Sequence, residues 1–175
     1  MLGSGVDLPG GLYLRPVRSS DAGFLAGLYS STRDDLRLIG NRDLSESLIE
    51  MQFTAQSTAF GQRYPDAMHL IIGELDTEIG RLVIDFSEGC VHLVDLSLRV
   101  EARGKGHGSA LIRAMQQVAA RMPAPVTLSV RQDNLAAAAL YRRLGFQNEQ
   151  HAGYHTRMVW YPRALMGAMQ AESQQ

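Results

Sequence analysis

The chain has 175 residues, of which 45% are hydrophobic and 20% are charged. This length is typical of one domain, and the composition is that of a folded globular protein. Seventeen Lys and Arg against eighteen Asp and Glu give a net charge of −1, so no bulk positive field favours nucleic acid as the principal partner. The single cysteine, Cys90, excludes an intrachain disulfide framework and a multi-cysteine zinc site, and it suits the reducing cytoplasm.

The N-terminal part predicts a strand followed by two helices. Residues 1–11 contain four glycines and a proline without periodicity, and we expect a flexible leader there. Residues 12–17 predict an edge strand, and Ser19 to Asp21 then offer N-cap residues to a first helix. Apolar residues at helical spacing predict a second helix over 44–60. No run approaches the roughly 20 apolar residues of a membrane span, so we expect no membrane partner.

The remaining residues alternate between strand and helix patterns. Short runs rich in Ile, Val and Leu predict strands over 69–75, 80–86, 91–100, 126–130 and 154–161. Amphipathic or alanine-rich patterns predict helices over 108–121 and from Asp133 or Asn134 to the stop at Gly145. The run over 91–100 shows little alternation and predicts a central strand buried on both faces. We therefore expect an α+β fold with helices on both faces of the sheet, one domain over 12–162, and a tail or short helix over 163–175.

The most informative segment runs from Leu96 to Ser109, where the central strand leads into a glycine loop and then a helix. Glycines let the backbone approach a ligand, and the first N–H groups of a helix favour an anion. Arg103 and Lys105 add two positive charges, which favours a pyrophosphate over a single carboxylate. The pattern predicts a site for a nucleotide-type cofactor.

Two familiar phosphate loops do not fit this segment. A P-loop needs Lys and then Ser or Thr after its last glycine, whereas Gly106 and Gly108 are followed by His107 and Ser109. The dinucleotide pattern G-x-G-x-x-G fails because Ser109 occupies the place of its third glycine. This failure, together with the lack of repeated βαβ units, disfavours a dinucleotide oxidoreductase.

A second pattern follows the loop. Asn134 opens the next helix, and Leu140-Tyr-Arg-Arg-Leu-Gly-Phe146 ends it. With Arg103-Gly-Lys-Gly-His-Gly108, these motifs resemble those of the GNAT N-acetyltransferase family, whose acetyl-CoA loop reads Arg or Gln, two residues, Gly, one residue, Gly or Ala. Leu14-Arg-Pro16 resembles the family's first strand, so the resemblance covers residues 12–161. It implies a mixed, mostly antiparallel, splayed sheet of about six or seven strands.

The resemblance also implies a function and a set of site residues. It implies an acetyl-CoA-dependent N-acetyltransferase in which a primary amine of a small molecule or peptide attacks the thioester directly. The loop N–H groups would hold the pyrophosphate, the strand end and Asn134 would bind the pantetheine arm, and a strand N–H near Leu98 would hold the oxyanion. The cofactor-binding residues implied are Leu98, Val100, Arg103, Gly104, Lys105, Gly106, His107, Gly108, Ser109, Asn134 and Tyr141. Val100 replaces a proline that is frequent in the family.

Three residues are candidates for catalysis. Tyr141 matches the family tyrosine that protonates the departing thiolate, although a core aromatic is the alternative, and Asn134 is equally well explained as a helix N-cap. Many members place a Glu just before an Asp on the central strand, but here the pair is Val94-Asp95. Asp95 could replace that base or could be a buried carboxylate tied to backbone donors, and His92 is a second candidate through a bridging water.

Other features suggest no additional chemistry. The local sequence places no His or Asp to activate Cys90 as an acyl-accepting nucleophile, so we interpret it as a packing residue. The five histidines lack metal-ligand spacing, and we expect no metal.

The amine acceptor should lie against the first two helices, roughly residues 29–64. Residues 21–66 carry seven acidic and four basic side chains, which suits a cationic amine, although an ordinary solvated surface explains most of them. A non-catalytic acyl-CoA-binding or sensing module is the alternative, since the strand Glu is absent. Homodimers are frequent in the family, but no interface stripe predicts one here.

Overall fold

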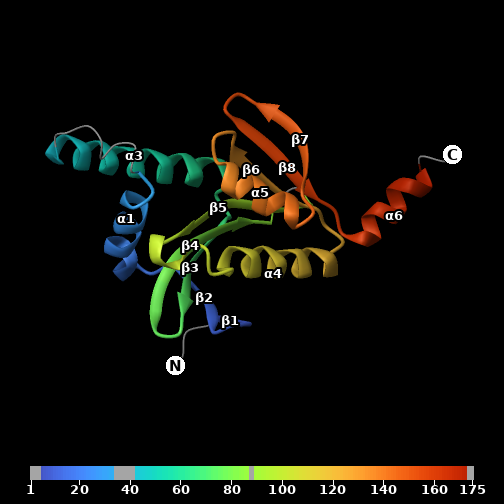
Figure 1. The fold of residues 1–175 in the computed structure, drawn as a ribbon, viewed down its shortest axis with the longest axis horizontal. Helices are drawn as coiled ribbons and strands as arrows, with labels where there is room; N and C mark the ends of the chain where they lie inside the picture. The colour runs from blue at the N-terminus through green and yellow to red at the C-terminus, as the bar shows by residue number, and fades with distance from the viewer. Residues whose placement is uncertain (1–4, 34–41, 87–88, 173–175) are drawn as a thin grey trace. The chain divides into compact units, whose positions relative to one another are not determined.

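The computed structural model describes residues 5–33, 42–86 and 89–172, which form a mixed α+β fold (Figure 1). Its eight strands form one mostly antiparallel sheet in the order β1-β2-β3-β4-β5-β6-β8-β7. The strands are β1 (Val6–Leu8), β2 (Leu12–Pro16), β3 (Met68–Glu74), β4 (Thr77–Asp85), β5 (Val91–Leu98), β6 (Val126–Arg131), β7 (Gln147–Ala152) and β8 (His155–Trp160). The helices are α1 (Ala22–Ser30), α3 (Arg42–Arg63), α4 (His107–Arg121), α5 (Leu135–Arg143) and α6 (Arg163–Glu172), with short 3-10 turns η1 (Ser19–Asp21) and η2 (Val100–Ala102).

Two compact units make up the chain, one formed by residues 1–83 and 95–105 and the other by residues 84–94 and 106–175. In the first unit, β2 pairs antiparallel with both β1 and β3. Its core contains Ile71, Ile72 and Leu82, which are almost completely buried. Helices α1 and α3 pack against each other, with the rings of Tyr29 and Phe53 5.2 Å apart.

Strand β1 lies within the segment expected to be a flexible leader. Val6 lies opposite Leu14 and Leu8 opposite Leu12, so ordered structure begins before residue 12. The prediction missed this hairpin because only three residues pair on its first strand. The β1 side chains are mostly exposed, so they leave no hydrophobic pattern to detect.

The first helix is held to β2 by a buried ion pair. Arg15 donates two hydrogen bonds to the Asp21 carboxylate, at 2.7 and 2.8 Å, and a third of 2.6 Å to Glu78. The Arg18 N–H donates to the same Asp21 carboxylate at 2.7 Å. The Arg15 guanidinium is the main cause that lowers the pKa of Asp21 from 3.8 to about 2, against the opposing effect of burial. Side-chain contacts therefore hold the turn between β2 and α1.

In the second unit, β5 begins parallel to β6, in a register that runs from Val91 opposite Val126 to Leu93 opposite Leu128. Strand β8 pairs antiparallel with both β6 and β7. Helix α4 buries Leu111, Ile112 and Met115, the face predicted from its spacing. The Gln116 side chain donates to the Leu144 carbonyl at 2.8 Å, which fixes the end of α5 against α4.

Most predicted elements are confirmed; besides β1, two strands differ from the prediction. Strand β7 was not predicted, because its six residues are all exposed and polar or small, so no hydrophobic alternation marks it. Strand β5 is central as expected, but its side chains from Val94 to Leu98 are only half-buried. The C-terminal segment, left open as a tail or a helix, forms α6. None of the helices in the described ranges is long and apolar enough to cross a membrane.

Candidate active site

The predicted site residues fall in both units, and each group is described within its own unit. In the first unit, β5 ends at Leu98, and the turn η2 leads to Arg103. The Arg103 Nε–H donates to the Leu98 carbonyl at 3.0 Å, while the Arg99 N–H donates to the Ile79 carbonyl of β4 at 2.8 Å. The side chain of Arg103 thus holds the backbone at Leu98, a second predicted site residue, where the chain leaves the sheet.

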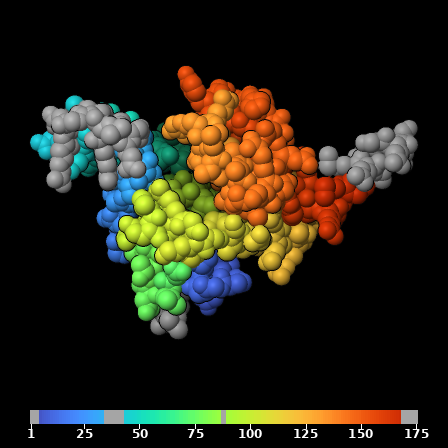
Figure 2. Space-filling view, in the orientation of Figure 1, coloured from blue at the N-terminus to red at the C-terminus, as the bar shows by residue number. Residues whose placement is uncertain are grey.

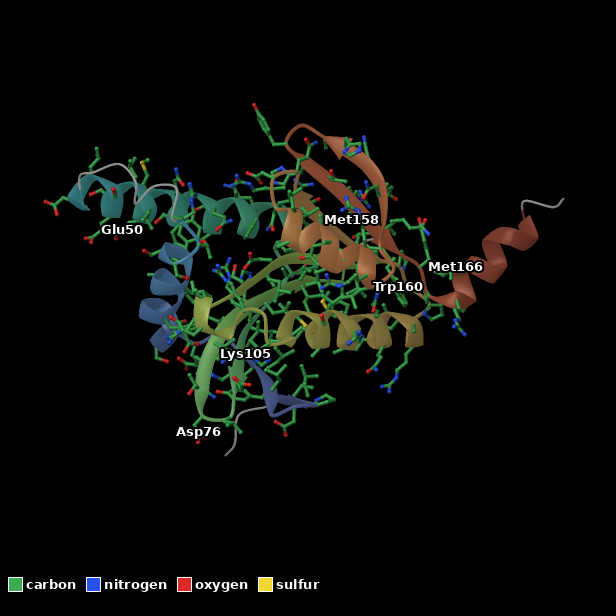
Figure 3. The ribbon with its side chains drawn as sticks, viewed as in Figure 1. Glu50, Asp76, Lys105, Met158, Trp160 and Met166 are labelled. Atoms are coloured by element: carbon green, nitrogen blue, oxygen red, sulfur yellow. The ribbon has the colours of Figure 1, made fainter. Side chains whose placement is uncertain are left out.

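The glycine loop has the backbone geometry that the anion prediction requires. Gly104 and Gly106 have φ of +75° and +89°, the left-handed region that favours glycine. A Cβ on either would meet no atom within 4 Å, so open space lies beside the backbone. Lys105, between them, is exposed and lies in the loop before α4 (Figure 3).

Helix α4 of the second unit starts directly after this loop. Gly106 is its N-cap and offers no side-chain oxygen to the first turn. The first backbone hydrogen bond across this turn joins the Ala110 N–H to the Gly106 carbonyl at 3.0 Å. At the start of any helix, the first N–H groups have no earlier helical turn to donate to. Here these are the N–H groups of residues 107–109. An anion beside this turn would meet those donors and the positive end of the helix dipole.

Helix α5 carries the other two family positions, Asn134 and Tyr141. The Asn134 side-chain oxygen accepts from the Ala137 N–H at 3.1 Å, which confirms the predicted N-cap. Tyr141 is 9% exposed, and its ring centroid lies 5.8 Å from that of Phe146. The start of α4 packs on the same helix, since a Cβ on Gly108 would lie 3.4 Å from Leu140. Tyr141 is thus held in a packed environment, and this packing is compatible with both readings of its role.

The far end of α5 is closed by the last strand. Trp160 of β8 lies there (Figure 3), with its ring 3.3 Å from the position of a Cβ on Gly145. Gly145 has φ of +86°, so the helix stop predicted from this glycine is confirmed.

Asp95, in the first unit, is tied to side chains and not to backbone donors. Its carboxylate accepts from Arg81 Nε at 3.0 Å and from the Ser97 hydroxyl at 3.2 Å, and its side chain is 18% exposed. Burial lowers the pKa of His69 and Arg81 lowers it further, whereas Asp95 raises it. Because Arg81 and Ser97 both bind this carboxylate, the geometry favours a structural role for Asp95.

His92, in the second unit, belongs to a small polar chain on β5 and β6. Its Nδ1 lies 2.8 Å from the Thr127 hydroxyl, which also donates to the Cys90 sulfur at 3.8 Å. The local sequence placed no histidine to act on Cys90, but the parallel pairing of β5 and β6 links the two through Thr127. Thr127 is 35 residues away from His92 in the sequence, so only the strand pairing could reveal the link.

A pocket in the first unit was not predicted. It lies between α1 and the residues that follow β5. The guanidinium carbon of Arg99 lies over the Phe24 ring, 4.9 Å from the ring centroid. Gly23 and Gly27, spaced by one helical turn, were the only sequence signal for a hollow on α1. Of the acidic residues counted near the acceptor region, Asp34 and Asp35 lie outside the described residues.

Comparisons with known proteins agree with the motifs. The sequence matches the model of the Acetyltransferase (GNAT) family over residues 33–146. No curated protein sequence matches the chain significantly. Among solved structures, the PaiA N-acetyltransferase of Thermoplasma acidophilum in complex with coenzyme A is similar, with a TM-score of 0.65 and 20% identity over 86% of this chain and 98% of that one.

Two further structures have the same fold. A RimL ribosomal L7/L12 alpha-N-protein acetyltransferase in complex with coenzyme A has a TM-score of 0.64 and 17% identity over 92% of this chain and 99% of that one. An acetyltransferase from Thermus thermophilus has a TM-score of 0.63 and 19% identity over 89% of this chain and 99% of that one. The family match extends over well over half of the chain and includes both the glycine loop and α5, and this chain therefore belongs to the GNAT acetyltransferase family.

Proposed function

We propose that this protein is an acetyl-CoA-dependent N-acetyltransferase that acetylates a primary amine of a small molecule or peptide by direct attack. The observation that carries the proposal is the open glycine loop at the start of α4. Gly104 and Gly106 expose their backbone beside space that no side chain fills, next to the charges of Arg103 and Lys105. These features fit a pyrophosphate.

The chain's own residues divide the work in this proposal. The N–H groups from Gly104 to Ser109 bind the pyrophosphate, and the end of β5 at Leu98 and Val100 binds the pantetheine arm and the oxyanion. Asn134 uses its carboxamide oxygen as the helix cap, so its NH2 group can donate to the same arm. Acetyl-CoA, as co-substrate, supplies the acetyl group as an activated thioester.

Proton transfer needs one acid and one base. Tyr141 is proposed to donate a proton to the departing thiolate, since its phenol O–H stands at the position of the family tyrosine that does so. His92 and Asp95 are the two candidates for the base that receives the amine proton. Because Arg81 occupies the Asp95 carboxylate, we propose His92 as the base.

The first test is calorimetric titration with acetyl-CoA, with free CoA and NADH as comparisons, followed by a thiol-release screen over polyamines, aminoglycosides, amino acids and peptide N-termini. Acetyl-CoA binding with thiol release from one amine class is the expected result. Binding without release from any amine would support the sensing module instead. Absence of acetyl-CoA binding would refute both.

The roles of Tyr141, His92 and Asp95 are tested by kinetics. Tyr141→Phe should lower kcat by about 100-fold with little change in KM, because it removes a donor needed mainly in the transition state. His92→Gln should remove the lower limb of the kcat/KM pH profile, whereas Asp95→Asn should keep it. Unchanged kcat in Tyr141→Phe would return this residue to a purely structural role.

A further inference from the structure

The pocket beside α1 lies in the first unit and shares one lining residue, Val100, with the proposed cofactor site. Its volume is about 290 Å³, close to the lower limit of small-molecule sites. Figure 2 shows the segment around residue 100, in yellow, at the surface of the molecule. The lining residues are Gly23, Phe24, Gly27, Leu28, Ser31, Arg99, Val100 and Glu101.

Glycines on α1 make the pocket possible. A Cβ added to Gly23 or Gly27 would meet no atom within 4 Å, so both point into open space. Glycine is less favourable than alanine in a helix, yet α1 carries two glycines one helical turn apart. The helix therefore has a hollow where ordinary helix-forming residues would fill the space.

Two opposite charges line this hollow. The guanidinium carbon of Arg99 lies over the Phe24 ring, 4.9 Å from the ring centroid, and a guanidinium on an aromatic face can still donate its N–H groups to an acceptor. Within the described ranges of the chain, neither Arg99 nor Glu101 forms an ion pair with any residue. An arginine fixed on an aromatic face presents paired donors, which match the two oxygens of a carboxylate.

We infer that this pocket binds the carboxylate of the acceptor, so that the acceptor is an amine that is also an acid, such as a free amino acid. Arg99 supplies the partner of the carboxylate, and Glu101 adds one negative charge that suits the ammonium group of the same molecule. Leu28, Val100 and the Phe24 ring supply apolar surface for a side chain of moderate size.

The position along the chain supports an acceptor and not a separate ligand. Val100 and Glu101 precede Arg103, the first residue of the proposed acetyl-CoA loop, by three and two residues. The inference rests on the proposed function, because an acceptor needs an acyl donor nearby. By this inference, Arg99 determines which amines the protein acetylates.

Binding of three matched probes tests the carboxylate directly. L-leucine, L-leucinamide and isopentylamine share the isobutyl side chain of leucine and an amine, but only leucine has a carboxylate. In two-dimensional NMR of the whole protein, leucine should shift the amide resonances of Gly23, Gly27 and Ser31 saturably. The amide and the amine should bind at least about tenfold more weakly, the size of one charge-assisted pair.

Two arginine variants separate this effect from general charge. Arg99→Gln should remove the preference for leucine, so that the three probes bind within about twofold of one another. Arg121→Gln, at the exposed end of α4, should keep the preference. Equal affinity of the three probes in the unsubstituted protein, or no saturable shift, would overturn the inference.

A pair of glycine variants tests the pocket by filling it. Gly27→Leu places a side chain into the hollow, and it should abolish leucine binding while helix propensity favours the fold. Gly61→Leu, on α3, is the control, because a Cβ there also meets no atom within 4 Å and it does not line the pocket. Full leucine binding in Gly27→Leu would overturn the inference.

The titration with acetyl-CoA distinguishes the two proposals. A more than tenfold loss of acetyl-CoA affinity in Arg99→Gln would mean that Arg99 binds a cofactor phosphate, which overturns the acceptor inference and leaves the proposed function intact. Failure of the unsubstituted protein to bind acetyl-CoA would refute the proposed function, whatever the probes do.

Discussion

Two helices, α1 and α4, begin after a strand, and their starts differ. We call the start of α1 the closed entry, because a side chain binds there, and the start of α4 the open entry, because its N-cap residue has no side chain. Between β2 and α1, the Asp21 carboxylate accepts from the Arg18 N–H and from Arg15, so a side chain binds a backbone donor of that turn. Between β5 and α4, Gly106 sits at the N-cap position with φ of +89° and no side chain. Side-chain contacts stabilise the first turn, whereas the second leaves exposed backbone at which we propose that an anion binds.

The largest effect is expected from closing the open entry. Gly106→Glu places a carboxylate where the proposed pyrophosphate binds, so steric block and charge repulsion should lower acetyl-CoA affinity by at least about 100-fold. Calorimetric titration measures the loss. Gly10→Glu is the matched control, since Gly10 also has positive φ (+85°) and no atom within 4 Å of a Cβ. Equal affinity in folded Gly106→Glu would contradict the loop assignment.

Opening the closed entry should affect stability and leave binding alone. The pKa of Asp21 is about 2 against its ordinary 3.8, and a shift of that size corresponds to roughly 2 kcal/mol of stabilisation near neutral pH. Asp21→Asn should lower the free energy of unfolding by about that amount in urea denaturation. Asp133→Asn removes an exposed pair with Arg131 and should leave the urea midpoint unchanged. A similar loss in both variants would show that burial at Asp21 does not matter.

The same carboxylate predicts a pH dependence. Because the folded pKa of Asp21 is depressed, its contribution is complete above pH 3.8 and is lost as the pH falls through about 2. The stability difference between the unsubstituted protein and Asp21→Asn should therefore be largest at pH 5 and should shrink towards zero near pH 2. Urea midpoints at pH 5, 4, 3 and 2 measure it. A difference that stays constant over this range would mean that the carboxylate charge is not its source.

The open entry could be predicted from sequence because it is local. A glycine loop with Arg103 and Lys105 after a strand, and a helix start at Gly108, lie within a dozen residues, and α4 begins at His107, one residue from the expected start. The N-cap at Asn134 was predictable for the same reason. Short-range patterns determine the turn type and the helix start, so the sequence contains the necessary information.

The contacts between distant residues could not be predicted. Arg99 meets Phe24 across 75 positions, and Arg15 meets Glu78 across 63. Such pairs depend on strand register and helix packing, which the pattern of apolar residues does not specify. Polar β7 and three-residue β1 were missed because neither buries a hydrophobic face.

The smallest effect is expected at the start of α5. One residue there has both a helix-capping role and a proposed role in cofactor binding. Asn134 caps α5 with its oxygen, and the proposal assigns its NH2 group to the pantetheine arm. Asn134→Ala removes both functions, so the free energy of unfolding should fall by about 1 kcal/mol and KM for acetyl-CoA should rise. Asn134→Asp keeps a capping oxygen but has no donor, so stability should be retained while KM still rises about threefold to tenfold. Urea denaturation and steady-state kinetics on the two variants measure the two quantities separately. If KM rises in Asn134→Ala alone, the residue acts through the helix it caps and not through the cofactor, and α5 then belongs with the closed entry of α1.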